Sequence, residues 1–296
     1  MSLIKSIGEK KVNLDFNKDF ISIFSDKIKS ADIQFINQTL KDLHPSDVAN
    51  LIENLSYDTR AKLIEIEEFD IDPEIFIEIN ESIQSEVLQL LSDDSIAKIL
   101  KRLESDNSIA ILENLDSKKK TAVLDKLPPK DRFLLEEGLS YPEDSAARIM
   151  QREFTAVPSD WSVGQTIDYL RESKDLPQEF LEIFVVDNDF KPIGIVPSSR
   201  VLRTPRDSKM KSIMREMPVM ISVNMDKEEV GHAFENYNLI SAGVVNKNNK
   251  LVGMITADDV VTVVQEEAEE DALRLAGVGD EEITDSVFVK TKRRFN

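Results

Sequence analysis

The chain has 296 residues, which is long enough for about two domains. Its 56 acidic and 37 basic residues give a net charge of −19, so we expect no nucleic acid partner, because such a chain repels phosphates. With no cysteine and only two histidines, the sequence excludes disulfides, thiolate zinc sites and multi-histidine metal sites.

Residues 20–139 are predicted to form a domain of short α-helices built on a 12-residue repeat. Leucines recur at this spacing in two phases. One phase is Leu91, Leu103, Leu115, Leu127 and Leu139, and the other is Leu88, Leu100, Leu112 and Leu124. Each unit opens with polar residues suited to capping a helix and continues with apolar residues at helical spacing. One short helix cannot bury its apolar side alone, so the repeat predicts a right-handed superhelix of stacked helices with the leucines in its core.

The repeat also carries acidic residues between its predicted helices, and two roles are open for them. These residues are Glu104, Asp106, Asp116 and Asp131. Helix capping or a solvated surface is the more common role of such residues, because a helix N-terminus favours negative charge. Binding of a cation is the alternative.

From residue 140 the pattern changes to alternating strands and helices. Residues 140–150 are expected to form a short joining helix, and two copies of a β-α-β-β-α unit span 140–205 and 206–264. Strands are predicted at 154–157, 182–187 and 192–196 in the first copy, and at 219–223, 241–246 and 250–256 in the second. Helices are predicted at 162–173 and 227–238. Gly194 and Gly253 are separated by the same interval as Val201 and Val260, which indicates a tandem duplication.

The end of the second copy is typical of a CBS domain. Gly253 precedes a strand that ends in Thr256, and Asp259 lies in the first turn of the helix that follows. The tandem unit therefore resembles a CBS-domain pair. This resemblance implies binding of ATP or another adenine nucleotide through Thr256 and Asp259. In the first copy Arg200 takes the place of the aspartate, so the resemblance implies one such site rather than two.

The motifs on either side of this pair are more specific. The sequence YPEDSA precedes the pair at residues 141–146, and the acidic sequence QEEAEEDALRLAGV follows it at 265–278. Together with the helical repeat, they resemble the cytosolic region of MgtE-type magnesium transporters over residues 30–280. The resemblance implies an α plus α/β fold: the superhelix, CBS domain 1, CBS domain 2, and a connecting helix with a membrane-proximal tail at 265–296.

The resemblance also implies a function, which is magnesium sensing at the cytoplasmic face of the cell membrane rather than enzymatic catalysis. High magnesium closes the assembly and the pore, whereas at low magnesium the acidic domains repel one another and the pore opens. The partners implied are magnesium ions, a second copy bound through the CBS domains, and the protein's own transmembrane domain. Basic residues at 290–294 are typical of the cytoplasmic flank of a membrane helix, so we expect this sequence to stop just before that domain.

Six acidic positions are implied as magnesium ligands. They are Asp106, Glu228, Asp259, Glu267, Glu270 and Asp271. Mg²⁺ prefers oxygen ligands and keeps several waters, so one or two carboxylates suffice for a weak sensor site. The last three follow one another at helical spacing and share one helix face. Four positions depart from the family pattern and leave the number of sites open: Asn107, Ala110, Asn238 and Thr262.

Two other interpretations remain open. A free-standing CBS-domain sensor of adenine nucleotides would be stabilised by nucleotide without magnesium. A helical-repeat scaffold for a protein partner would respond to neither ligand. We find no enzyme signature, since neither His44 nor His232 has a nucleophile at a spacing that suggests catalysis.

Overall fold

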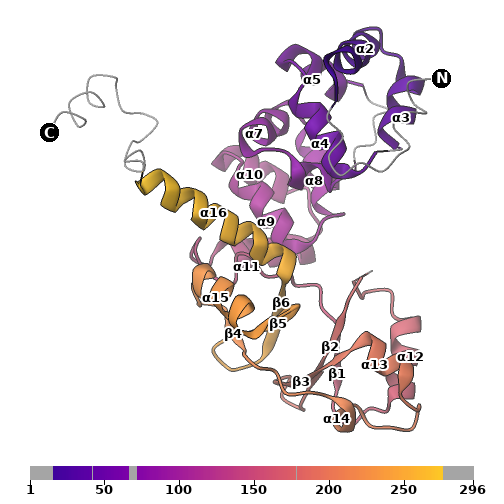
Figure 1. Ribbon diagram of the computed structural model, residues 1–296, viewed down its shortest axis with the longest axis vertical. Helices are drawn as coiled ribbons and strands as arrows, with labels where there is room; N and C mark the ends of the chain where they lie inside the picture. The colour runs from indigo at the N-terminus through magenta and orange to yellow at the C-terminus, as the bar shows by residue number, and fades with distance from the viewer. Residues whose placement is uncertain (1–15, 42, 67–71, 178, 276–296) are drawn as a thin grey trace, which may run out of the picture. The chain divides into compact units, whose positions relative to one another are not determined.

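The computed structural model describes residues 16–41, 43–66, 72–177 and 179–275, as shown in Figure 1. Along the last helix, nothing is described of the side chains at positions 266, 269–271 and 273–275. The chain divides into two compact units, residues 1–138 and 139–296.

The first unit has the predicted architecture of short helices in sequence. Its helices are α2 (Lys18–Lys29), α3 (Ile33–Lys41), α4 (Pro45–Glu53), α5 (Tyr57–Ile64), α6 (Ile75–Glu78), α7 (Glu81–Leu90), α8 (Asp93–Leu100), α9 (Ser105–Glu113), α10 (Ser117–Leu124) and α11 (Pro129–Leu139). Helices α8 to α11 begin at positions 93, 105, 117 and 129, which is the spacing of the predicted repeat. Helices α4, α5 and α7 begin at positions 45, 57 and 81, in phase with the same spacing. The predicted repeat is therefore confirmed.

Polar side chains cap several of these helices, as the sequence predicts. The Ser92 hydroxyl accepts a hydrogen bond at 3.1 Å from the backbone N–H of Ser95. Asp116 accepts bonds from the N–H groups of Lys119 and Lys118 at 3.0 and 2.9 Å, and these bonds lower the pKa of its carboxyl. His44 caps α4 in the same manner. Of the two roles considered for Asp116, the structure shows the helix cap.

The two leucine phases differ in depth. The phase formed by Leu88, Leu100, Leu112 and Leu124 is buried throughout. In the other phase Leu115 and Leu127 are buried, whereas Leu91, Leu103 and Leu139 are half-buried. The half-buried residues lie at or just past a helix end, so the earlier phase supplies most of the leucine core.

A partly buried ion pair joins helices of the repeat. The Arg60 side chain on α5 is buried, and its Nε lies 2.6 Å from Oε1 of Glu86 on α7. Its Nη1 also donates to the backbone oxygen of Leu55, which follows α4, at 2.5 Å. One guanidinium thus links three helices and satisfies a carbonyl group at a helix end.

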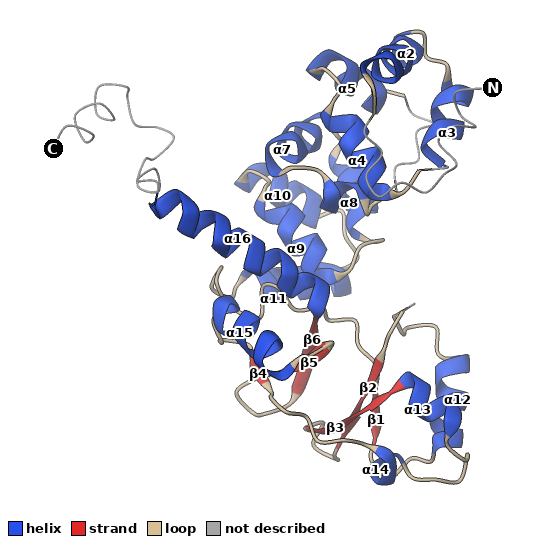
Figure 2. Ribbon diagram, viewed as in Figure 1, coloured by secondary structure: helices blue, strands red, loops and turns tan. Residues whose placement is uncertain are grey.

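The second unit contains two copies of a small α/β fold, whose sheets are drawn in red in Figure 2. Its elements are β1 (Ala156–Pro158), α12 (Val163–Glu172), β2 (Glu182–Val186), β3 (Pro192–Pro197), α13 (Ser198–Arg203), α14 (Met210–Ile213), β4 (Ile221–Ser222), α15 (Lys227–Tyr237), β5 (Ser241–Val245), β6 (Leu251–Thr256) and α16 (Ala257–Leu275). In each sheet the first strand runs parallel to the second, and the second pairs antiparallel with the third. The predicted duplication is confirmed.

The two copies do not keep one spacing throughout. Strands β2 and β5 begin at Glu182 and Ser241, which are separated by the same interval as Gly194 and Gly253, as predicted. Helices α12 and α15 begin at Val163 and Lys227, and their separation is larger. The additional length of the first copy therefore lies between α12 and β2. In the second copy this connection is short, because Asn238 ends α15 in the left-handed conformation with φ of 49°.

Residues 140–150 do not form the predicted joining helix. The chain makes turns there, and Ala146 and Ala147 are fully buried. The N–H of Ala146 donates to Met225 O at 2.7 Å, and that of Ala147 donates to Val223 O at 3.1 Å. The prediction was wrong because these N–H groups bond to the second copy, whereas a helix would need them for its own hydrogen bonds.

Each sheet is completed by the segment that precedes the first strand of the other copy. Gln151, ahead of β1, pairs with β6, and Arg215, ahead of β4, pairs with β3. A Cβ atom on Gly253 would lie 2.6 Å from the backbone oxygen of Gln151, and one on Gly194 would lie 2.8 Å from that of Arg215. Such close backbone approach explains why glycine stands at both matched positions.

Candidate functional site

The junction between β6 and α16 holds the two residues predicted to bind a nucleotide. Asp259 Oδ2 accepts hydrogen bonds from the backbone N–H of Thr256 at 3.1 Å and from its Oγ1 at 2.5 Å. The Nε2 atom of Gln151 lies 3.4 Å from the same oxygen. The half-buried carboxylate therefore caps the first turn of α16, and the structure brings Thr256 and Asp259 together.

The matching junction between β3 and α13 has different chemistry. Pro197 and Arg200 occupy the positions of Thr256 and Asp259. The Nη1 atom of Arg200 donates to the backbone oxygen of Ile213 at 2.9 Å. This junction therefore lacks the carboxylate that could hold a ribose hydroxyl or a cation, and it is positively charged instead.

A second polar junction joins α16, the first turn of α15 and the loop ahead of β1. The Lys227 Nζ lies 3.9 Å from Oε1 of Glu267 and 3.7 Å from Oδ1 of Asp144. The Lys227 and Glu267 side chains are 17% and 23% exposed. The predicted magnesium ligand Glu267 therefore lies beside a lysine ammonium in a partly buried position.

Two further positions of interest lie on α15. Glu228 is exposed at the second position of this helix, and its N–H donates to the capping carboxylate of Asp226 at 2.8 Å. Asn238, where the family pattern has an aspartate, is the left-handed residue that ends α15. Asparagine adopts this conformation more readily than most residues, so the position has a backbone role.

Asp106 belongs to the other unit and lies in the first turn of α9. Its exposure is 6%, in contrast to the exposed Glu228. Because Mg²⁺ keeps several of its waters when it binds protein, exposed carboxylates are more accessible to it than buried ones. Of the predicted ligands whose side chains are described, Asp106 is the least accessible.

Three predictions lie outside the described residues. They concern the side chains of Glu270 and Asp271 and the basic cluster at 290–294; α16 includes only the backbone of the first two. Within the part of the chain that the structure describes, no three His, Asp or Glu side chains are grouped so that they could hold a metal ion. The donor chemistry of these carboxylates fits a weakly held, hydrated cation better than a tight metal centre.

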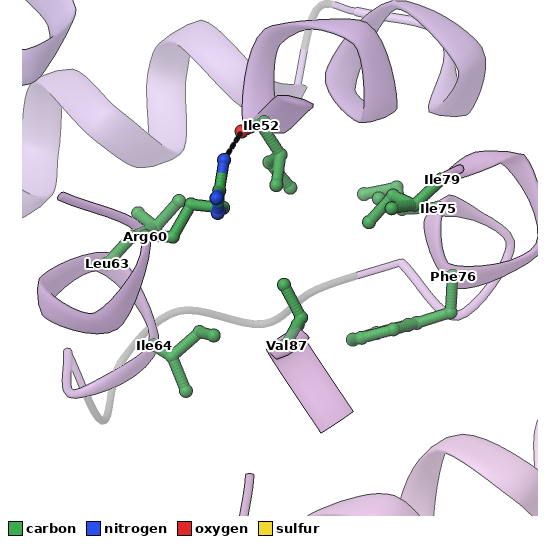
Figure 3. Close-up of a pocket in the computed structure, with 8 residues that line it drawn as sticks. All are labelled: Ile52, Arg60, Leu63, Ile64, Ile75, Phe76, Ile79 and Val87. Atoms are coloured by element: carbon green, nitrogen blue, oxygen red, sulfur yellow. Dashed lines mark hydrogen bonds between the residues drawn. The ribbon is translucent and has the colours of Figure 1, made fainter. Parts of the chain in front are cut away.

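The helical unit also has a small pocket, drawn in Figure 3. It is lined by Ile52, Arg60, Leu63, Ile64, Ile75, Phe76, Ile79 and Val87. Figure 3 shows the Arg60 guanidinium turned toward Ile52, to whose backbone oxygen it donates. The lining contains no carboxylate, so this pocket does not suit magnesium.

Comparison with known families assigns both units. Residues 43–144 match the MgtE intracellular N domain, and residues 146–207 and 210–266 match the CBS domain. The chain therefore carries an MgtE intracellular N domain and a CBS-domain pair. This result confirms the family resemblance and the predicted fold class.

The chain is similar to curated proteins named magnesium transporter MgtE. It is 25% identical to the protein of Enterococcus faecalis over 160 residues, which cover 54% of this chain and 35% of the relative. It is 27% identical to that of Bacillus subtilis over 157 residues, which cover 53% and 35%. It is 29% identical to that of Thermus thermophilus over 150 residues, which cover 51% and 33%. The chain thus matches about a third of the length of these relatives.

Two solved structures share the fold. One is the soluble part of a magnesium transporter, with a TM-score of 0.72 and 21% identity, covering 84% of this chain and 98% of that one. The other is the cytosolic domain of the Mg²⁺ channel MgtE in complex with ATP, with a TM-score of 0.72 and 24% identity, covering 80% and 97%. None of the helices among the described residues is both long and apolar enough to span a membrane.

Sequence reasoning missed three residues at these junctions: Gln151 beside Asp259, Lys227 beside Glu267, and Asp144 beside Lys227. The available signal is the YPEDSA motif, which contains Asp144 and which by itself indicates only the family. No spacing rule connects that motif to residues so far along the chain, so only the folded structure reveals these contacts.

Proposed function

We propose that this chain is the magnesium-sensing regulatory region of an MgtE-type transporter and has no catalytic activity of its own. The observation that carries the proposal is that β6 of the second CBS copy runs directly into the acidic helix α16, which bears Asp259 and Glu267. In a chain with a net charge of −19, bringing acidic surfaces together costs electrostatic energy unless cations screen them.

The proposed mechanism is domain closure by hydrated magnesium. At high magnesium, ions bridge carboxylates of the helical unit, the CBS pair and α16, and the region closes. At low magnesium the same carboxylates repel one another and the region opens. In this proposal the pore that responds lies in a transmembrane domain, and this region lies at the cytoplasmic face of the membrane. The relatives named as magnesium transporters support this proposal.

We assign the magnesium contacts to the acidic residues predicted from the sequence. They are Glu228, Asp259, Glu267, Glu270, Asp271 and Asp106. Exposed Glu228 and half-buried Asp259 and Glu267 are the strongest assignments, because a hydrated ion can reach their oxygens without unfolding the chain. Buried Asp106 is the weakest.

We also propose that the CBS copies form the interface of a homodimer. Each copy carries a matched pair of apolar side chains that are more than half exposed. They are Leu181 and Leu202 in the first copy, and Ile240 and Val261 in the second. Ile240 follows Leu181, and Val261 follows Leu202, at the interval that separates Gly194 from Gly253. Large exposed apolar side chains that recur in both copies favour burial against a second chain.

A second candidate ligand is an adenine nucleotide, and one observation favours it. Thr256 and Asp259 lie together at the β6–α16 junction, where their oxygens could bond to ribose hydroxyls. ATP in the similar MgtE cytosolic domain supports the idea. With Pro197 and Arg200 at the matching positions of the first copy, we expect at most one such site in each chain.

The melting temperature of the chain distinguishes these possibilities. We expect magnesium to raise it saturably above the value in sodium chloride of equal ionic strength, because bound ions stabilise the folded state. Stabilisation by ATP alone, with no effect of magnesium, would instead favour a free-standing nucleotide sensor. Indifference to both ligands would favour a protein-binding scaffold.

A further inference from the structure

We propose that Lys227 is a built-in cation that sets the magnesium threshold of α16, because it neutralises Glu267 when magnesium is scarce. The inference rests on the proposed magnesium-sensing function and adds to it a residue that limits the response. The ammonium of Lys227 lies 3.9 Å from Oε1 of Glu267 and 3.7 Å from Oδ1 of Asp144. It therefore bridges two carboxylates on separate segments, as a divalent ion would.

The position of Lys227 is fixed by its backbone. It is the first residue of α15, directly after the capping residue Asp226, and its N–H donates to Asp144 O at 2.8 Å. Its side chain is only 17% exposed, so the ammonium stays near its partners instead of moving freely in solvent. A tethered charge of this kind has a high effective concentration at its partner.

Close packing of α15 on α16 keeps Glu267 within reach of this charge. The two helices lie side by side, as Figure 1 shows. A Cβ atom on Gly231, one turn beyond Lys227, would lie 3.4 Å from Val264 Cγ2, so the helices are in direct contact. Val264 precedes Glu267 by about one helical turn, which places both side chains on the α16 face toward α15.

Two consequences follow from this geometry. First, α16 remains attached to the CBS pair without magnesium, because Lys227 offsets the repulsion between Glu267 and the acidic groups at the start of α15. Second, a magnesium ion that binds Glu267 must displace the Lys227 ammonium or share the Glu267 carboxylate with it. This competition raises the magnesium concentration needed for binding. Lys227 is thus a positioning residue for the sensor.

Hydrogen exchange of the complete chain tests the proposal. Lys227→Gln removes the charge and keeps a long side chain, and Lys247→Gln, in the exposed β5–β6 turn, makes the same change in net charge elsewhere. Without magnesium, we expect K227Q to speed exchange of the α16 amides around Glu267 about threefold or more, with no change in K247Q. In a magnesium titration, we expect K227Q to lower the magnesium concentration that gives half-maximal protection about three- to tenfold.

A double-mutant cycle identifies the partner. If Lys227 acts through Glu267, K227Q has no further effect on α16 exchange when Glu267→Gln is already present. The proposal is overturned if K227Q exchanges like K247Q without magnesium, if its midpoint equals that of the unmodified chain, or if its effect is undiminished in the E267Q background.

The same data separate this inference from the proposed function. If magnesium protects neither the unmodified chain nor K227Q, magnesium sensing fails, and with it the threshold role of Lys227. If magnesium protects the unmodified chain and K227Q at the same midpoint concentration, the sensing function stands and only the Lys227 proposal fails.

Discussion

The two CBS copies share a fold but differ in the residues that bear ligand chemistry. Both have a three-stranded sheet with the same irregularity in the hairpin, a glycine at a close backbone approach, and a pairing with the segment that precedes the first strand of the other copy. At the end of the sheet, however, the first copy has Pro197 and Arg200 and a short helix, whereas the second has Thr256 and Asp259 and a long acidic helix. Residues that maintain the fold occur twice, and those suited to cations or nucleotides occur once.

A second asymmetry lies where the copies meet. Glu182 begins β2, and its counterpart in the second copy is Ser241, which begins β5. The Ser241 hydroxyl donates to Glu182 Oε2 at 2.7 Å, and Arg215 forms an ion pair with the other oxygen. The matched positions therefore contact each other through different chemistry, and the buried carboxylate joins the copies into one unit.

The largest expected effect comes from the glycines that both copies share. A Cβ atom on Gly253 would lie 2.6 Å from Gln151 O and also 2.6 Å from Met150 Sδ, and Gly194 has matching contacts at 2.8 Å with Arg215 O and Met214 Sδ. We expect Gly253→Ala and Gly194→Ala each to lower the free energy of unfolding by about 2–4 kcal/mol. Denaturant unfolding measures both, and a cost in only one copy would contradict the structural equivalence.

Loss of the buried carboxylate has a smaller expected cost. Glu182→Gln removes the charge that faces Arg215 and keeps the size of the side chain. Because Arg215 is half exposed, we expect a loss of about 1–2 kcal/mol in unfolding free energy rather than the full penalty of a buried pair. Glu235→Gln, on the exposed face of α15, is the matched control and should cost almost nothing. Equal losses in the two variants would show that Glu182 does not join the copies.

Asp259 tests the functional difference between the copies. Asp259→Ala removes the cap of α16, so we expect a loss of about 1 kcal/mol in stability together with a weaker magnesium response. Asp258→Ala, at the exposed neighbouring position, removes the same charge without removing the cap. Arg200→Ala makes the matching change in the first copy and should leave the magnesium response unchanged. A magnesium response that depends on Arg200 and not on Asp259 would assign magnesium sensing to the first copy instead of the second.

The smallest effect concerns an acidic residue with a purely structural role. The N–H groups of Lys119 and Lys118 lower the pKa of Asp116 below its ordinary value of 3.8, so its ionised form stabilises the folded state. The stability difference between the unmodified chain and Asp116→Ala should be constant well above pH 3.8 and should shrink as pH falls through the lowered pKa. Thermal melts from about pH 7 to about pH 2 measure this difference. Asp116→Ala should not change the magnesium response, which separates structural carboxylates from sensing ones.

The elements that sequence predicts best are those determined locally. The helices of the repeat follow from caps such as Ser92 and from leucines at helical spacing, and both signals lie within a single repeat. The Thr256–Asp259 contact can be predicted equally well from the sequence, because residues one turn apart at a helix start meet regardless of the rest of the fold. The family assignment came from motif resemblance rather than from composition or charge.

The failures involve contacts between distant segments. Residues 140–150 have a composition compatible with a helix, but bonds from Ala146 and Ala147 to the second copy override that preference. The Lys227–Glu267 contact joins residues on different helices, and no periodic pattern indicates it. Predicting such contacts requires the packing of α15 on α16, which a single sequence does not specify.

The most direct test of magnesium sensing is small-angle scattering of the chain during a magnesium titration to about 20 mM, a range suited to weak hydrated carboxylate sites. Sodium chloride holds the ionic strength constant, because screening alone also compacts an acidic protein. We predict a saturable fall in the radius of gyration beyond that in sodium, reduced in Asp259→Ala and unchanged in Arg200→Ala. A radius that stays the same in magnesium and sodium at every concentration would contradict magnesium-driven closure.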